Sequence, residues 1–300
     1  YFYKSDATLR DVFISYVGYG IGVDQGDLIL ERVDISDTFS DALAGYNNSK
    51  IFVSDSIVKD IWSGDAIGLY DNTELLFVNS SILDITDGSA IGLYGSHATA
   101  TNSVFSGGLD SGIELYDNWQ TGPSTIYLEN SLVENYLWSD LLVCCGSTAK
   151  VKKSVLRNSD YGVEVYDNTY PVLIPSFLFI EQSAIYDNGE YGLYSNAVFP
   201  TDAHNNWWGD ISGPQHPTLN PLGLGNAVSD NVLFDPWLAN DPTTEKRIDP
   251  VIIIPGILGS AEKDGEWLID PIFHTYDDLI ATLVANGYVQ DQAPGQNLFS

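Results

Sequence analysis

Ala66-Ile67-Gly68-Leu69-Tyr70 and Ala90-Ile91-Gly92-Leu93-Tyr94 are two copies of one five-residue phrase. In each copy, apolar side chains alternate with small or aromatic ones, and a period of two is typical of a β-strand. Ile67 and Leu69 would point to one side of the strand, and Gly68 and Tyr70 to the other. The phrase therefore predicts one strand in each repeat, with an apolar side and an outward side.

Related phrases occur along the first two thirds of the chain, at steps of 22 to 28 residues. A nearly fixed period in this range indicates a repeat architecture, in which stacked units share one apolar core. The first apolar positions of the copies, as aligned from the sequence, are Ile21, Leu43, Ile67, Ile91, Ile113, Leu141, Val163 and Tyr191.

A second short strand is expected in most repeats, as in Asn79-Ser80-Ser81-Ile82 and Asn130-Ser131-Leu132. Pairs such as Asp71-Asn72 and Asp187-Asn188 are typical of turns between strands. Nothing between the strands has helical periodicity. Two or three strands in each repeat predict the coils of a parallel β-helix, so we expect an all-β solenoid.

These repeats resemble the right-handed parallel β-helix of pectin-lyase-like proteins. The resemblance covers about residues 10 to 238 and includes the closing motif Asn205-Asn206-Trp207-Trp208-Gly209-Asp210. It implies a parallel β-helix domain over residues 1–238. An open solenoid end exposes strand edges and apolar interior. The bulky side chains expected to plug it are Trp207, Trp208, Phe234 and Trp237.

The composition excludes several kinds of partner. The formal net charge is −29, from 41 acidic and 12 basic residues. Such a chain would not neutralise phosphates, so we expect no nucleic-acid binding and no attraction to anionic membranes. No apolar run is long enough to span a bilayer. The acidity favours an extracellular or cell-surface protein. Because the chain has no methionine and starts inside the repeat pattern, we expect a piece of a longer protein.

The two cysteines, Cys144 and Cys145, are adjacent. Neighbouring cysteines form a strained disulfide at best, so no disulfide framework is expected. The chain also has no Cys/His spacing of a metal site. We therefore expect no cofactor, apart from the calcium alternative given next.

One tyrosine column is the main candidate binding site of the solenoid. If the coils stack, equivalent tyrosines lie about 4.8 Å apart, where they would bind sugar rings or stack on one another for stability. We favour self-stacking. The aspartates that follow three of these tyrosines are candidates for a calcium column, although turn formation explains them equally well and is preferred. The tyrosines are Tyr70, Tyr94, Tyr116, Tyr166 and Tyr194, and the aspartates are Asp71, Asp117 and Asp167.

Catalysis by the solenoid itself is the least favoured hypothesis. A glycosidase needs carboxylates that converge on one bond, whereas the acidic residues here sit mostly at turns. A lyase needs a cationic base, and the basic residues cluster only in the run Lys150, Lys152, Lys153 and Arg157. We place this run on one exposed edge of a coil.

After Leu238 the sequence changes character. Residues 239–249 are polar and predict a linker. Val251 to Ile254 predict a buried strand of a parallel sheet. Thr275 to Asn286 predict a helix, with Tyr276 and Leu279 on one apolar stripe. A strand, a loop and a helix open an α/β unit.

Residues 250–300 resemble the start of lipase-like α/β-hydrolases of the lecithin:cholesterol acyltransferase and esterase branch. The matching motif is Pro250-Val251-Ile252-Ile253-Ile254-Pro255-Gly256-Ile257-Leu258-Gly259-Ser260. The resemblance implies that the backbone N–H of Ile257 or Leu258 would serve an oxyanion hole. The chain has no Gly-x-Ser-x-Gly motif, so it lacks the nucleophile, and Ser260 is not a candidate.

The sequence thus predicts a β-helix followed by a truncated α/β-hydrolase fragment. The first functional hypothesis is part of a secreted or cell-surface serine hydrolase. Its solenoid would bind a surface or polymeric glycan, and its missing domain would cleave an ester or lipid. The alternative is a carbohydrate-binding or adhesive surface protein without catalysis. A polysaccharide lyase or glycosidase comes third.

Overall fold

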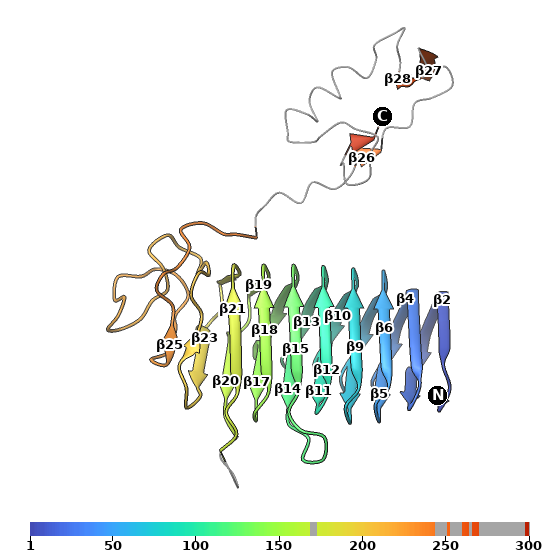
Figure 1. The fold of residues 1–300 in the computed structure, drawn as a ribbon, viewed down its shortest axis with the longest axis horizontal. Coiled ribbons are helices and arrows are strands. Elements are labelled where there is room, and N and C mark those ends of the chain that lie inside the picture. Colours follow the sequence, from blue (N-terminus) through green and yellow to red (C-terminus); the bar gives the residue numbers. More distant parts are fainter. Residues whose placement is uncertain (169–172, 244–250, 253–259, 264–265, 270–297, 300) are drawn as a thin grey trace. The chain divides into compact units, whose positions relative to one another are not determined.

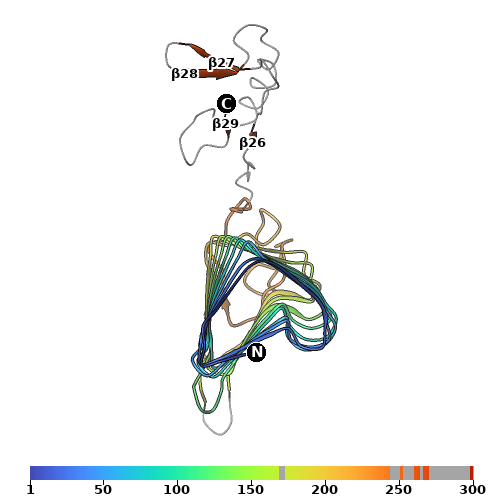
Figure 2. The same ribbon diagram turned by 90° about the vertical axis from the view of Figure 1, so that its right-hand side faces the viewer.

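The computed structural model describes residues 1–168, 173–243, 251–252, 260–263, 266–269 and 298–299 (Figure 1). The contacts divide the chain into two units, Tyr1–Thr243 and Thr244–Ser300. In the first unit the strands lie side by side along one axis (Figure 1). Seen along that axis, the coils superimpose as a closed ring with three faces (Figure 2).

Face A is the nine-stranded sheet, with one strand from each coil. Its strands are β1 (Phe2–Tyr3), β3 (Ile21–Asp24), β5 (Leu43–Tyr46), β8 (Ile67–Tyr70), β11 (Ile91–Tyr94), β14 (Ile113–Tyr116), β17 (Ser139–Cys144), β20 (Tyr161–Tyr166) and β23 (Tyr191–Asn196).

The 16-stranded sheet forms the other two faces. The long strands β2 (Ala7–Val17) and β4 (Asp27–Thr38) run through both of them. Face B contains β6 (Lys50–Ser54), β9 (Glu74–Val78), β12 (His97–Thr101), β15 (Thr125–Glu129), β18 (Thr148–Lys152), β21 (Phe177–Glu181), β24 (Thr201–Asp202) and β25 (Val232–Leu233). Face C contains β7 (Ile57–Ile61), β10 (Ser81–Ile85), β13 (Val104–Gly108), β16 (Leu132–Tyr136), β19 (Val155–Arg157) and β22 (Ala184–Tyr186).

The parallel register places equivalent residues above one another. Ile91 pairs with Ile67 and Ile113, and Leu93 pairs with Leu69 and Leu115. All six of these side chains are fully buried. A coil cannot bury this apolar side alone, so stacking supplies the shared core. The predicted parallel β-solenoid is confirmed.

Two details of the predicted alignment are wrong. Val163 pairs with Leu193, not with Tyr191, because the longer loop after β20 displaces the last copy by two residues. Asn79 and Ser80 lie at a corner before β10 instead of in a strand, and Asn79 has a left-handed φ of 50°. Asparagine tolerates that conformation, which turns the chain between faces B and C.

The Ser that follows the corner residue forms a buried ladder along the axis. The Ser80 N–H donates to Ser103 Oγ at 3.3 Å, and the Ser103 N–H donates to Ser131 Oγ at 3.1 Å. Each hydroxyl also donates to a nearby carbonyl, as Ser103 does to Thr101 at 2.8 Å. Buried N–H groups need such partners. The ladder comprises Ser56, Ser80, Ser103, Ser131, Ser154 and Ser183, and it ends on Asn206.

Three of the four predicted side chains plug the end of the core, whereas Trp207 is half-buried and is not part of the core cluster. Trp208 is fully buried and Phe234 is 3% exposed. Trp237 packs against the core, with its ring centroid 6.3 Å from that of Phe234. Trp207 bridges Ala184 through its backbone.

The described part of the second unit consists of short strands. β26 (Val251–Ile252) pairs in parallel with β29 (Leu298–Phe299), and β27 (Ser260–Lys263) forms a hairpin with β28 (Glu266–Ile269). Of the strand predicted over Val251 to Ile254, the two described residues, Val251 and Ile252, are in a strand. The oxyanion candidates Ile257 and Leu258, and the helix predicted over 275–286, lie outside the described residues. No helix occurs among the described residues, and so none that crosses a membrane.

Candidate functional site

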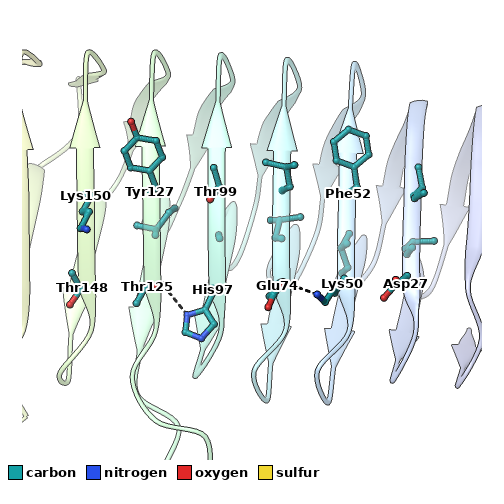
Figure 3. A pocket seen from close by; sticks show the side chains of 17 residues that line it. Asp27, Lys50, Phe52, Glu74, His97, Thr99, Thr125, Tyr127, Thr148 and Lys150 are labelled. Carbon is teal, nitrogen blue, oxygen red and sulfur yellow. Dashed lines mark hydrogen bonds and ion pairs between the residues drawn. The ribbon is translucent and has the colours of Figure 1, made fainter.

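The outer side of face B is hollowed into an elongated groove of about 800 Å³ (Figure 3). Its lining comes from six neighbouring strands, β4, β6, β9, β12, β15 and β18. At about 4.8 Å per strand, these strands span about 24 Å along the axis. A groove of this volume is in the range of ligand-binding sites.

One row of outward side chains in the groove is polar. The register aligns Asp27, Lys50, Glu74, His97 and Thr125 on successive strands (Figure 3). Lys50 Nζ lies 3.5 Å from Glu74 Oε2, and His97 Nδ1 lies 2.8 Å from Thr125 Oγ1. This row offers both hydrogen-bond donors and acceptors to a ligand.

A second row is partly aromatic. Phe52 and Tyr127 are half-buried and face outward, while Lys150 follows Tyr127 in register and is itself followed by Phe179. Burial, together with the Glu129 carboxylate that accepts a hydrogen bond from its hydroxyl, raises the pKa of Tyr127. Tyr127 therefore stays a neutral phenol and a hydrogen-bond donor.

A second hollow of about 790 Å³ continues the groove toward β21 and β24, and shares Tyr127 and Lys150 with the first. Here Lys152 Nζ lies 3.0 Å from Glu181 Oε1, and His204 Nδ1 lies 2.6 Å from Asp202 Oδ1. The two hollows thus line one face over eight neighbouring strands. The basic run predicted on a coil edge is divided: Lys150 and Lys152 lie in the groove, and Arg157 pairs with Glu134 on face C.

The predicted tyrosine column lies on face A and begins one coil earlier than expected, at Tyr46. The ring centroids of Tyr46 and Tyr70 are 5.1 Å apart, those of Tyr70 and Tyr94 5.0 Å, and those of Tyr94 and Tyr116 5.8 Å. The interplanar angles of these pairs are 9°, 5° and 6°. The ring faces are therefore turned toward one another, and the edges and hydroxyls face outward.

The prediction that Tyr194 continues this column is wrong. It pairs with Glu164, and the partner of Tyr166 is Asn196. The rings of Tyr194 and Tyr166 still approach to 5.8 Å, but at an interplanar angle of 46°. The displaced last repeat explains the difference. Sugar stacking on the column stays a prediction.

Buried and half-buried carboxylates accompany the column. The Tyr94 hydroxyl donates to Asp65 Oδ2 at 3.2 Å, and the Tyr166 hydroxyl donates to Glu164 Oε1 at 2.6 Å. Burial, with the charge of Asp65, raises the pKa of Asp41 to about 6. Burial, with the charges of Asp110 and other carboxylates, raises the pKa of Glu114 to about 7. These groups bind protons more readily than exposed acids.

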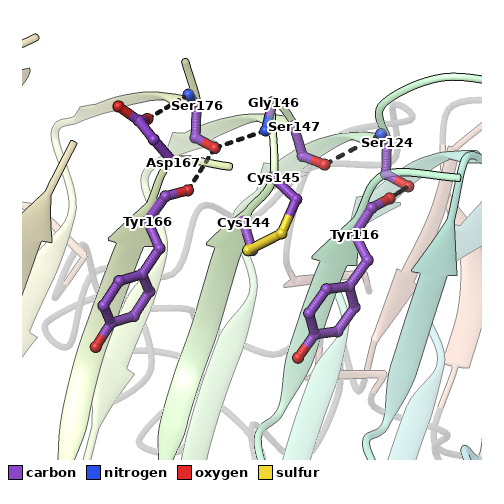
Figure 4. The surroundings of a disulfide bond; sticks show 9 residues. All are labelled: Tyr116, Ser124, Cys144, Cys145, Gly146, Ser147, Tyr166, Asp167 and Ser176. Carbon is purple, nitrogen blue, oxygen red and sulfur yellow. Dashed lines mark hydrogen bonds between the residues drawn. A yellow bond between two sulfur atoms is a disulfide. The ribbon is translucent and has the colours of Figure 1, made fainter. Parts of the chain in front are cut away.

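A disulfide between Cys144 and Cys145 interrupts the column (Figure 4). Cys144 pairs with Tyr166 and occupies the position between Tyr116 and Tyr166 (Figure 4). The next residue, Gly146, has a left-handed φ of 88°. A Cβ there would lie 2.3 Å from Ile174 Cγ2 and 3.7 Å from Pro123 Cβ, so loops of both adjacent coils close over this corner.

The three candidate calcium aspartates occupy equivalent positions but not adjacent ones. Gly95 stands between Asp71 and Asp117, and Cys145 stands between Asp117 and Asp167. Asp71 Oδ1 accepts from the Asn118 amide at 2.8 Å, and Asp167 Oδ1 accepts from the Ser176 N–H at 2.7 Å. Across the described segments no three His, Cys, Asp or Glu residues gather as a metal site. Calcium at these aspartates stays a prediction.

The groove on face B is what the sequence reasoning missed. A signal for it exists, because Ile51 and Val53, Leu75 and Phe77, and Ile126 and Leu128 alternate with outward residues in the same register. The sequence alignment followed only the phrase on face A and the Ser-containing corners. Phe52, His97 and Tyr127 were therefore not placed on one surface.

Comparison with known proteins agrees with the geometry. Residues 1–137 match the family model described as right handed beta helix region. The solenoid is thus a right-handed parallel β-helix. No protein of curated function matches the sequence.

The solved structures that are similar to the chain include the following two. The mannuronan C-5 epimerase AlgE4 A-module of Azotobacter vinelandii has 13% identity and a TM-score of 0.39, over 63% of this chain and 71% of that chain. Pectate lyase Pel9A has 10% identity and a TM-score of 0.24, over 72% of this chain and 70% of that chain.

Proposed function

We propose that the solenoid binds a glycan chain along the groove of face B, as a targeting or adhesive module outside the cell or on its surface. The observation that carries this proposal is the combination, in one elongated groove, of half-exposed aromatic rings with a continuous polar row. The proposal requires no catalysis and no metal.

The chemistry of sugars supports it. A sugar ring has an apolar face, which packs on an aromatic ring, and hydroxyl groups, which need hydrogen-bond partners. Phe52, Tyr127 and Phe179 supply rings, and Asp27, Glu74, His97 and Thr125 supply the partners. The repeat of about 4.8 Å between strands suits a ligand that is itself built from repeating units.

The tyrosine column of face A is the less favourable place for a sugar. Its ring faces are occupied by neighbouring rings at 5.0 to 5.8 Å, so a ligand meets only edges and hydroxyls. We keep it as a second candidate, to be compared with face B in the same binding experiment.

A serine-hydrolase domain that begins near residue 250 stays a prediction from the sequence motif. Its oxyanion candidates, Ile257 and Leu258, lie outside the described residues. Binding by the solenoid does not depend on that domain. The glycan proposal corresponds to the alternative hypothesis of the sequence analysis, and it also serves a hydrolase as a targeting module.

The test is glycan binding by the whole chain and by groove variants. In an array followed by isothermal titration calorimetry, we expect Tyr127→Ala and Phe52→Ala each to weaken binding by roughly 2- to 10-fold, since an aromatic contact contributes about 0.5–1.5 kcal/mol. Tyr19→Ala is the matched control, because Tyr19 is 80% exposed and outside the groove. Loss of binding in Tyr94→Ala but not in Tyr127→Ala would move the site to face A.

A further inference from the structure

We infer that the glycan bound by the groove is an uncharged polysaccharide. This inference rests on the proposed function and names its substrate class. It is carried by the charges of the groove, which nearly cancel on a protein whose total charge is strongly negative.

The first hollow contains equal numbers of opposite charges. Asp27 and Glu74 are its carboxylates, and Lys50 and Lys150 are its ammonium groups. Lys50 and Glu74 form an ion pair at 3.5 Å, so neither is left to attract a charged ligand strongly. The remaining lining is apolar, hydroxyl or imidazole.

The second hollow shares Lys150 with the first and adds Lys152, Glu181 and Asp202. Over both hollows, three ammonium groups therefore stand against four carboxylates. Lys152 is paired with Glu181 at 3.0 Å, and Asp202 with His204 at 2.6 Å. Two residues beyond the lining residue Ile29 on β4, Glu31 is paired with Arg10. The balance therefore extends along the face and is not a property of one coil.

The rest of the molecule disfavours an anionic chain. The formal net charge is −29. A polyanion would approach against this field over a distance of about 30 Å at 0.01 M salt and about 10 Å at 0.1 M. The groove offers it Lys150 as the one lining ammonium without an ion pair among the described residues. A cationic chain gains nothing from the groove either, since the acidic surfaces outside it attract such a chain more strongly.

An uncharged chain is not repelled by the negative charge of the protein and needs no unpaired opposite charge in the groove. Its apolar ring faces contact Phe52, Tyr127 and Phe179, and its hydroxyls exchange hydrogen bonds with both members of each ion pair. Hydrogen bonds to charged groups are the stronger ones. Alternating donors and acceptors along the polar row suit hydroxyl groups, which both donate and accept.

The experiment measures the affinity of the whole chain for an uncharged β-glucan, an uncharged mannan and a polyuronate, at 20 mM and 300 mM NaCl. We expect an uncharged chain to bind with a dissociation constant that changes less than 2-fold with salt and rises in Tyr127→Ala. We expect the polyuronate to bind at least 10-fold more weakly at 20 mM NaCl.

A charge variant sharpens the test. Thr99→Lys adds an ammonium group to the middle of the groove, where Thr99 lies between Leu76 and Tyr127 in register. We expect this variant to bind polyuronate more tightly than the unmodified protein does, and to lose that gain at 300 mM NaCl. If the unmodified protein binds polyuronate more tightly than the uncharged chains, and Tyr127→Ala weakens that binding, the inference is wrong while glycan binding stands. Binding of none of the three chains overturns both.

Discussion

Replacing Glu114 by Gln should make the solenoid more stable at pH 8 and remove part of its pH dependence. Glu114 is 9% exposed on face A, in the row behind the tyrosine rings. Burial is the main reason why the pKa of Glu114 rises from an ordinary 4.5 to about 7. The charges of Asp110, Asp65 and Glu164 add to this rise. The side chain is therefore protonated in the folded protein at a pH where it is ionised in the unfolded chain.

The sign follows from proton binding. Below pH 4.5 the Glu114 carboxyl is protonated in both the folded and the unfolded state, and its contribution to the free energy of unfolding is fully present. As the pH rises from 4.5 to about 7, only the folded state holds the proton, so stability falls, and above about 7 it levels off. Each pH unit in this window contributes about 1.4 kcal/mol, so the free energy of unfolding should fall by about 3 kcal/mol over the window.

Thermal unfolding followed by circular dichroism at pH 5, 6, 7 and 8 measures the effect. At 2–4 °C per kcal/mol for a unit of this size, about 3 kcal/mol corresponds to roughly 6–12 °C. We expect the wild-type midpoint to fall by at least this amount from pH 5 to 8, since Asp41 contributes in the same direction, and the fall to be smaller in Glu114→Gln. Asp87→Asn is the control, because Asp87 is exposed. Equal pH profiles for wild type and Glu114→Gln would refute the reasoning.

Three further predictions concern the scaffold. Ser103→Ala leaves the buried Ser80 N–H without its acceptor and should lower the free energy of unfolding by about 1–3 kcal/mol, measured by urea denaturation; an unchanged midpoint would contradict the ladder. In Gly146→Ala the new Cβ would require a left-handed φ and would lie 2.3 Å from Ile174 Cγ2. We therefore expect limited proteolysis to cut residues 117–124 or 173–176 faster than in wild type. Reducing Cys144–Cys145 with a dithiol should change stability by no more than about 1 kcal/mol, because the closed loop is minimal; a larger loss would assign the disulfide a wider role.

Much of the fold was predictable because its strongest signal is local. The alternation of Ile67, Gly68 and Leu69 indicates a strand with one buried side, and the repetition of this phrase indicates that such strands stack. Trp208 and Phe234 were predictable as a plug for the same reason, since bulky apolar residues next to a solenoid end have one place to go. These inferences depend on periodicity and burial, which the sequence carries directly.

The groove and the end of the tyrosine column were less predictable because they depend on register. The longer loop after β20 shifts the partner of Tyr166 from Tyr194 to Asn196, and loop length does not state which residue resumes the pairing. Lys150 and Tyr127 come together on face B only when the strands are aligned in three dimensions. The pKa of Glu114 likewise follows from burial behind tyrosine rings, which no sequence spacing reveals.

The corner between faces A and B accommodates insertions that leave the stacked strands unchanged. Leu43 follows its register partner Ile21 by 22 residues, whereas Leu193 follows Val163 by 30, yet both pairs lie in the same buried row. The additional residues lie at this corner, where antiparallel bridges join Asn118 to Gly122 and Asn168 to Ile174. Inserted segments at this corner thus contact other coils, as Asn118 contacts Asp71, without changing the buried row. New recognition loops can therefore be introduced at this corner, by evolution or by protein engineering, while the stacked coils keep their structure.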